Sequence, residues 1–161
     1  MHPPQRHQSP YKKLKIGVVG YSRTNLPEAQ ARTLLQACFK AFIVRAKVDR
    51  LQVEVVSGLT NAGIPKIAYE LASQWQVKTV GISAREALEA ECGIFPVRKQ
   101  MIIGQKFGDE SSYFIQYIDC LARIGGGKQS LREVEMFKEK LHHDPQQLAR
   151  WLIEHELDLL E

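Results

Sequence analysis

Three consecutive glycines stand where a short apolar run gives way to a segment with helical periodicity. Gly125–Gly127 follow Cys120–Ile124 and precede a helix that we predict to begin at about Ser130. Glycines let the backbone turn sharply and bring several N–H groups to one point. The start of a helix adds unpaired N–H groups and the positive end of its dipole. Together these groups can hold a phosphate or another anion, although a tight strand-to-helix turn without a ligand is the alternative.

The side chains after the glycines each have a chemical and a structural interpretation. Lys128 can pair with phosphate as a point charge or remain solvated. Glu133 can stabilise a developing oxocarbenium ion or position a water, as carboxylates do in glycosidic cleavage. Ser130-x-x-Glu133 is equally a capping box, in which the two side chains bond the first amides of the helix. The sequence leaves both interpretations open.

Two further turns, Gly20–Asn25 and Ser57–Gly63, are rich in small and hydroxyl residues and also follow predicted strands. Loops at the carboxyl ends of parallel strands converge at one edge of a sheet, where ligands bind. We therefore expect all three turns to form one site of phosphate or nucleotide size. The expected ligand contacts are Gly20, Ser22, Arg23, Gly58, Thr60, Asn61, Gly125, Gly126, Gly127, Lys128, Gln129 and Ser130.

Some of these contacts have competing interpretations, and the loop spacings disfavour two familiar classes of nucleotide-binding protein. Arg23 is the preferred phosphate-binding arginine because it stands at a strand end, whereas Thr60 and Asn61 can instead serve only the entry into the next helix. Neither the dinucleotide spacing G-x-G-x-x-G nor the P-loop spacing G-x-x-x-x-G-K-[ST] is present. The spacings therefore disfavour an NAD-dependent dehydrogenase and a Walker ATPase.

Strands and helices alternate along the chain, which predicts an α/β protein. The expected fold is a Rossmann-like three-layer αβα sandwich with a mostly parallel sheet. Strands are expected at Leu14–Gly20, Leu51–Ser57, Val77–Ser83 and Cys120–Ile124, with Val97–Ile103 as an ambiguous further strand. Helices are expected at about Asn25–Ala46, Ile64–Trp75, Ser83–Glu91, Glu110–Tyr117, Ser130–His142 and Pro145–Leu160, the first of them capped by Asn25. Residues 14–161 are expected to form one domain after a disordered leader, residues 1–13.

The bulk composition predicts a cytoplasmic globular protein. Of 161 residues, 44% are hydrophobic and 25% charged, and no apolar run reaches the length of a membrane span. The three cysteines, Cys38, Cys92 and Cys120, are scattered in apolar contexts, so we expect reduced, buried thiols and neither a disulfide nor a zinc site. The net charge of +4 suits an anionic small molecule, while the scattered basic residues disfavour nucleic acid as a partner.

Three segments carry a resemblance to a known family. VGYSR at residues 19–23, VSGLTNAGIPKIAYELA at 56–72 and IGGGKQSLREVE at 124–135 resemble the SMF/DprA–Lonely Guy (SLOG) superfamily of Rossmann-like proteins, over residues 14–142. The third segment is similar to the PGGxGTxxE motif of the Lonely Guy (lysine-decarboxylase-like) phosphoribohydrolases, with matches at Gly126, Gly127, Ser130 and Glu133. The resemblance implies a dimer that binds nucleoside monophosphates or related anions and, in its enzymes, releases the free base. Molybdenum-cofactor carriers are relatives that bind without this chemistry.

The sequence departs from the Lonely Guy pattern at several positions. Gly125 replaces the motif's proline, and Gln129 replaces its third glycine. Without a gap, the family's catalytic arginine corresponds to Glu110, whereas Arg98 in VRKQM resembles that arginine only if an insertion precedes Asp119. Arg98 can otherwise be a solvated surface arginine.

The acidic pair Asp109 and Glu110 has two interpretations as well. Both residues can bind a ribose hydroxyl or cap the helix that follows, and the cap is favoured. The predicted function is binding of a nucleotide or related phosphorylated molecule by a homodimer, with no cofactor or metal required. The alternatives are a nucleoside 5′-monophosphate phosphoribohydrolase that uses Glu133 with Arg98, and a molybdenum-cofactor carrier.

Overall fold

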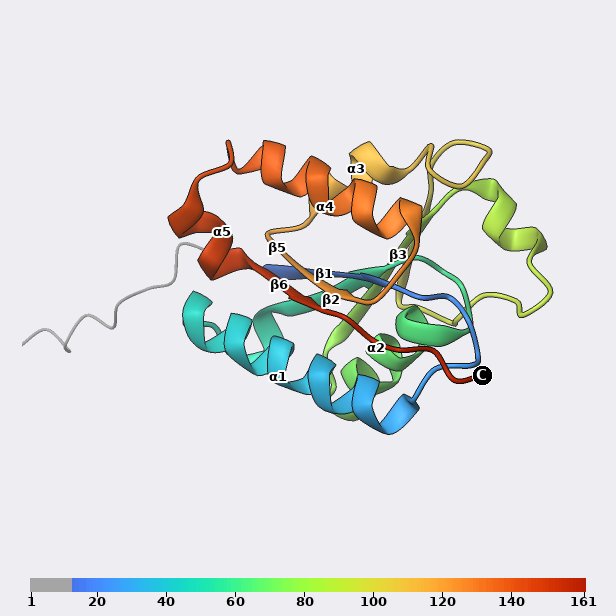
Figure 1. The fold of residues 1–161 in the computed structure, drawn as a ribbon, viewed down its shortest axis with the longest axis horizontal. Helices are drawn as coiled ribbons and strands as arrows, with labels where there is room; N and C mark the ends of the chain where they lie inside the picture. The colour runs from blue at the N-terminus through green and yellow to red at the C-terminus, as the bar shows by residue number, and fades with distance from the viewer. Residues whose placement is uncertain (1–12) are drawn as a thin grey trace, which may run out of the picture.

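A parallel β-sheet with helices on both faces forms the centre of the molecule (Figure 1). The structure is a computed structural model and describes residues 13–161. Within this range the sheet has six strands in the order β4-β3-β2-β1-β5-β6, and every neighbouring pair is parallel. The strands are β1 Leu14–Gly20, β2 Val53–Ser57, β3 Lys78–Ser83, β4 Lys99–Ile102, β5 Cys120–Ile124 and β6 Leu152–His155.

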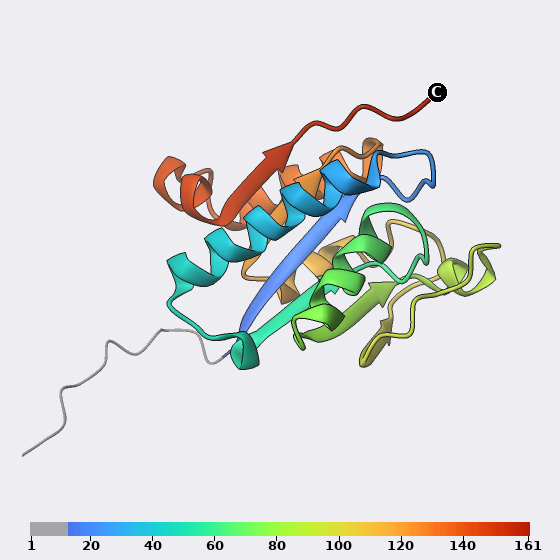
Figure 2. The ribbon, with the colours of Figure 1, turned by 90° about the horizontal axis from the view of Figure 1, so that it is seen from below.

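Helices cover both faces of this sheet, which makes the fold a three-layer sandwich. One face carries α1 and α2, and the other carries α3 and α4 (Figures 1 and 2). The α-helices are α1 Glu28–Ala46, α2 Gly63–Gln74, α3 Ser111–Tyr117, α4 Lys128–Lys140 and α5 Pro145–Trp151, with short 3-10 helices η1 Arg50–Gln52 and η2 Arg85–Glu89. The predicted α/β class, with its Rossmann-like sandwich, is confirmed.

The central strands are buried because both faces of the sheet are covered. All five residues of β2 and of β5 are buried, and the charged members Glu54 and Arg123 are each paired. Aromatic side chains from the helices complete the core on both faces, including the fully buried Phe39 on α1 and Phe137 on α4. The alternation of apolar runs with amphipathic segments thus specifies both the layers and the core.

The last third of the chain differs from its prediction. We expected one helix over Pro145–Leu160, but α5 ends at Trp151 and the chain continues as β6 on the edge of the sheet. Leu152 pairs with Leu121, and Glu154 accepts a hydrogen bond from Arg123 at 2.7 Å. The buried guanidinium needs carboxylate partners, and the edge of β5 needs a neighbour. Both requirements arise from distant residues, which local periodicity does not reveal.

The predicted start of the first helix is also wrong. Asn25 does not cap α1, because the helix begins at Glu28 with Pro27 as its N-cap. Asn25 instead pairs with the C-terminal tail: its side-chain amide donates to the Leu160 carbonyl, and its own carbonyl accepts from the Leu160 amide, at 2.9 and 2.8 Å. The short helix expected at Ser83–Glu91 is present as the 3-10 helix η2, Arg85–Glu89.

The C-terminal tail is expected to stabilise the fold through Leu157, which is buried at 4% exposure. Leu157→Ala should lower the free energy of unfolding by about 2 kcal/mol, the low end for buried leucines, because a chain end can relax into the cavity. Leu160→Ala is the matched control, since that side chain is 54% exposed and should cost less than about 0.5 kcal/mol. Urea unfolding compares them, and equal effects would argue against this role for the tail.

Cys38 and Cys120 are buried as expected, but Cys92 is exposed because it follows η2 in a surface turn, so that prediction is wrong for one cysteine. None of the described helices is both long and apolar enough to cross a membrane. The predicted leader, residues 1–13, lies outside the described residues except for Lys13. The homodimer stays a prediction.

Candidate functional site

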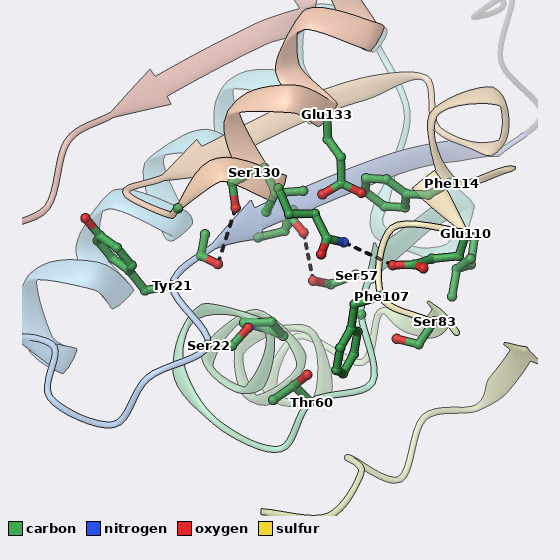
Figure 3. Close-up of a pocket in the computed structure, with 18 of the residues that line it drawn as sticks. Tyr21, Ser22, Ser57, Thr60, Ser83, Phe107, Glu110, Phe114, Ser130 and Glu133 are labelled. Atoms are coloured by element: carbon green, nitrogen blue, oxygen red, sulfur yellow. Dashed lines mark hydrogen bonds between the residues drawn. The ribbon is translucent and has the colours of Figure 1, made fainter. Parts of the chain in front are cut away.

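A pocket of about 600 Å³ opens at the carboxyl ends of β1, β2 and β3, beside the start of α4 (Figure 3). All three predicted loops contribute to its lining, so they share one edge of the sheet as expected. The predicted contacts that line it are Gly20, Ser22, Arg23, Gly58, Thr60, Gly127, Lys128, Gln129 and Ser130, and Glu133 lines it as well. Asn61, Gly125, Gly126 and Arg98 are not among the lining residues.

The N-terminus of α4 faces this pocket without a side-chain cap. The helix begins at Lys128, two residues earlier than predicted, and its N-cap is Gly127. Ser130 therefore lies inside the first turn, and its hydroxyl donates to the Gly20 carbonyl over 3.5 Å. Of the two interpretations of Ser130 and Glu133, the capping box does not form. The first intrahelical bond runs from Leu131 N to Gly127 O, so the amides before it stay available to a ligand.

The first two glycines of the triplet shape the loop rather than line the pocket. Gly126 has φ +108°, and a Cβ there would lie 2.6 Å from the Ser130 side chain. Gly125 has φ +61°, its amide donates to the His155 carbonyl at 2.8 Å, and a Cβ would meet the Tyr21 ring at 2.4 Å. The glycines thus let the β5–α4 loop approach both β6 and the β1–α1 loop closely.

A buried tyrosine fixes the β2–α2 loop. Tyr69 from α2 is fully buried; its hydroxyl accepts from Ser57 N at 3.0 Å and lies 3.0 Å from Gly58 O and 2.9 Å from Val80 O. The Ser83 hydroxyl accepts from the amide of Leu59 at 2.8 Å. These bonds hold Gly58 in place at the end of β2, so this wall of the pocket is rigid before any ligand binds.

The β1–α1 and β2–α2 loops are also locked to each other. Gly63, which begins α2 with φ +64°, has no room for a Cβ, since one would lie 2.1 Å from the Tyr21 carbonyl oxygen. The amide of Ile64 donates to that same oxygen at 2.7 Å. The backbone amide of Asn61 is not available to a ligand in the pocket, because it donates to Gly93 O at 3.2 Å. The expected role of Asn61 at the site therefore has no support from its position.

Two acidic side chains, Glu110 and Glu133, also line the pocket. Glu133 is 6% exposed and accepts a hydrogen bond from the Ser111 hydroxyl at 3.1 Å. Burial, with a smaller contribution from the nearby charge of Glu110, raises the pKa of Glu133 to about 7. Glu110 is 5% exposed and accepts from Gly108 N and from the Gln129 side-chain amide, each at 3.0 Å.

The predicted partnership of Glu133 with Arg98 is not formed. Arg98 is exposed and immediately precedes β4, and its amide donates to the Thr79 hydroxyl near the start of β3. That position is at the amino edge of a parallel sheet, whereas the pocket is at the carboxyl edge. The similarity of VRKQM to the family's arginine run therefore does not bring a guanidinium to the pocket.

The cap expected from Asp109 and Glu110 differs from the structure. Asp109 caps its own loop, because its Oδ2 accepts from the amides of Gln105 and Lys106 at 3.0 and 2.9 Å. Glu110 occupies the N-cap position of α3 but makes no side-chain cap there. Its carboxylate turns into the pocket instead, where Gln129 meets it (Figure 3).

Sequence reasoning missed Phe107, Ser83 and Tyr21 among the pocket-lining residues. Phe107 had a signal, since it is an aromatic residue in the polar, glycine-containing stretch GQKFGDE. Such a residue has no apolar stripe to join and therefore indicates a surface role. Tyr21 belongs to the predicted Gly20–Asn25 turn but is not one of the expected contacts, and Ser83 ends β3, whose loop is not among the three predicted for the site.

Comparison with known proteins identifies the fold. No protein-family model matches the sequence, and no curated protein matches it significantly. The molybdenum cofactor binding protein from the phototrophic bacterium Rippkaea orientalis superposes with a TM-score of 0.64 at 18% identity, over 91% of this chain and 78% of that chain. The molybdenum cofactor carrier protein of Chlamydomonas reinhardtii gives 0.63 at 14% identity, over 88% and 89%.

A third solved structure, that of TM1055, gives a TM-score of 0.60 at 17% identity, over 89% of this chain and 91% of that chain. At these identities the likeness concerns the backbone, and the alignment spans nearly the whole described chain in each case. The chain therefore has the Rossmann-like fold of the molybdenum cofactor carrier proteins.

Proposed function

We propose that this protein binds a phosphorylated small molecule of nucleotide size, with the phosphate at the N-terminus of α4. The observation that carries the proposal is the uncapped first turn of this 13-residue helix, which opens into a cavity of about 600 Å³. Unpaired amides and the helix dipole favour an anion at this point. The cavity volume lies in the range of small-molecule sites.

The charges around the pocket support this orientation. Among the described lining residues, Arg23 and Lys128 carry positive charge, and both side chains are exposed at the loop ends. Glu110 and Glu133 line the same pocket and would repel a second anionic group on the ligand. A ligand with one phosphate and one hydrogen-bonding, uncharged end therefore fits these charges better than a molecule with negative charge at both ends.

Thermal denaturation with added ligand tests the proposal. Guanosine and adenosine 5′-monophosphates, ribose 5-phosphate and inorganic phosphate would each be added to the full chain. At a concentration of about 100 Kd a ligand that binds the native state adds about 2.7 kcal/mol of stability. We expect the nucleoside monophosphates to raise the Tm and the parent nucleosides to have a much smaller effect. No shift with any phosphorylated compound would contradict the proposal.

Hydrolysis of a nucleoside 5′-monophosphate is a second candidate, and the position of Glu133 favours it. This carboxyl faces the pocket from α4, one turn beyond the proposed phosphate site, and has a pKa near neutrality, as a general acid–base group requires. Release of free base, absent in Glu133→Gln, would support the enzyme. Melting shifts without release would instead support a binding protein.

The similarity to molybdenum cofactor carriers favours a third candidate, a carrier of that cofactor. The carrier hypothesis uses the same pocket and needs no hydrolysis. Native mass spectrometry of the purified protein would distinguish it from a nucleotide-binding protein by the mass of the retained small molecule. A nucleotide mass would favour the main proposal, and a molybdenum-containing mass would favour the carrier.

A further inference from the structure

We propose that the loop Ile103–Glu110 recognises the ring system of the ligand. Phe107 stacks on a flat nitrogen heterocycle, and Glu110 accepts a hydrogen bond from an amino group on that ring. The inference rests on the proposed function, because it concerns the other end of the molecule whose phosphate binds at α4. It assigns the ligand to the amino-bearing heterocycles that carry a phosphate, in contrast to simple sugar phosphates.

The position of Phe107 is the first argument. Its side chain lines the pocket and remains 45% exposed, which is a large apolar surface to leave in water. Figure 3 shows its ring among the lining residues, between Glu110 and Thr60. An aromatic ring in this position presents its face to a ligand at a small entropic cost, and stacking of one base on such a ring is worth about 1–3 kcal/mol.

The loop that carries Phe107 is held by hydrogen bonds on each side of it. The Phe107 amide donates to Glu86 Oε2 at 2.9 Å, and the Gly108 carbonyl accepts from Arg132 Nη2 at 3.3 Å. Asp109 Oδ2 accepts from two backbone amides of the same loop, at 3.0 and 2.9 Å. The backbone is thus fixed before binding, so a ligand need not order the loop to obtain the stacking interaction.

Glu110 supplies the polar part of the recognition. Its side chain is buried, and each of its oxygens already accepts one hydrogen bond, from Gly108 N and from Gln129 Nε2. Each carboxylate oxygen can accept a further bond. An amino group on a stacked ring is a suitable donor, as in the acceptance by Glu of a base amino group. Because Gln129 lies on the first turn of α4, this bond also connects the ring end of the pocket with the phosphate end.

Isothermal titration of the full chain with two probes tests the stacking. Guanosine 5′-monophosphate contains the ring, whereas ribose 5-phosphate lacks it. We expect Phe107→Ala to weaken the nucleotide about tenfold and to leave ribose 5-phosphate unchanged, because only the nucleotide stacks. Tyr113→Ala is the matched control: Tyr113 is also exposed, at 42%, but lies on α3 and does not line the pocket. Equal effects of Phe107→Ala on both probes, or no effect on either, would overturn the inference.

The amino-group contact needs a second pair of probes. Inosine 5′-monophosphate lacks the exocyclic amino group of the guanine nucleotide and is otherwise the same. The wild type should prefer the guanine nucleotide by about tenfold, a typical gain for one good polar base contact, and Glu110→Gln should reduce this preference. Ribose 5-phosphate binding by Glu110→Gln reports whether the pocket is intact, and no preference in the wild type would refute the contact.

These outcomes distinguish a failure of ring recognition from a failure of the phosphate site. If ribose 5-phosphate and the nucleotides bind the wild type alike, the phosphate site stands and the ring recognition falls. If none of the probes binds the wild type, the proposed function falls and the inference falls with it. If the nucleotide binds the wild type more tightly than ribose 5-phosphate does, and Phe107→Ala removes this difference, both the phosphate site and the ring recognition are supported.

Discussion

Replacing Lys128 by glutamate is expected to weaken binding of a nucleoside monophosphate roughly 30-fold without destabilising the protein. Lys128 is the exposed first residue of α4 and lines the pocket. Two unit charges about 6 Å apart in water interact by about 0.7 kcal/mol, so reversing one charge opposite a phosphate with about one and a half charges costs about 2 kcal/mol. Stability should be unchanged or about 0.3–1 kcal/mol higher, because a carboxylate at a helix N-terminus is favourable.

Lys138→Glu is the matched control, because it makes the same change in net charge on the same helix. Lys138 lies in the last turn of α4 and pairs with Glu135 at 3.2 Å. The control should leave affinity unchanged and lower stability by about 0.5–1 kcal/mol, since a cation is favourable at the C-terminus. Titration calorimetry should therefore show weaker binding only for Lys128→Glu, and urea unfolding should show lower stability only for Lys138→Glu. Equal loss of affinity in both would show that overall charge, rather than the helix N-terminus, determines binding.

The second large effect concerns pH and Glu133. Burial raises its folded-state pKa from 4.5 to about 7, so between these values the folded protein binds the proton more tightly than the unfolded chain does. Stability contributed by this group is therefore complete at about pH 4.5 and is lost as pH rises through about 7. Glu133→Gln stays neutral, so it should exceed the wild type by about 2–3 kcal/mol at about pH 8.

Urea unfolding at about pH 5 and about pH 8 tests this pH dependence. The wild type and Glu133→Gln should have similar stability at the lower pH and diverge at the higher one. The neighbours that influence the titration are Ser111, Glu110, Gln129 and Arg132, all unchanged in the variant. Glu135→Gln, an exposed position on the same helix, should show no such divergence. A Glu133→Gln variant less stable than the wild type at both pH values would count against a buried, partly protonated carboxyl.

The buried strands of the sheet could be predicted from the sequence, whereas the edge strand β6 could not. Leu14–Gly20 and Cys120–Ile124 are strands at the predicted bounds, because a continuous apolar run between helical segments determines a buried parallel strand locally. The prediction for Leu152–His155 is wrong because this segment becomes a strand only through its pairing with β5 and with the charge of Arg123. Local patterns specify elements whose burial is complete, whereas edge elements depend on partners elsewhere in the chain.

For the pocket, too, the sequence predicts the general location but not the position of each side chain. The convergence of three loops was predictable, because parallel strands send their carboxyl ends to one edge. The positions of individual residues were not predictable. Gly125 and Gly126 allow the β5–α4 loop to pack closely against its neighbours. The Glu110 side chain points into the pocket, and Arg98 lies at the opposite edge of the sheet. Each of these depends on a contact between segments that are far apart in sequence. A motif match therefore indicates a loop that lines the pocket, but not which of its residues do so.

The phosphate position at α4 can be measured residue by residue through NMR of the ¹⁵N-labelled full chain titrated with guanosine 5′-monophosphate. An anion bound to unpaired amides shifts their resonances directly. The account predicts the largest saturable changes at the amides of Lys128, Gln129 and Ser130, together with Gly58 and Thr60 across the pocket. Saturable binding that leaves the three α4 amides unchanged, or no saturable change anywhere, would contradict it.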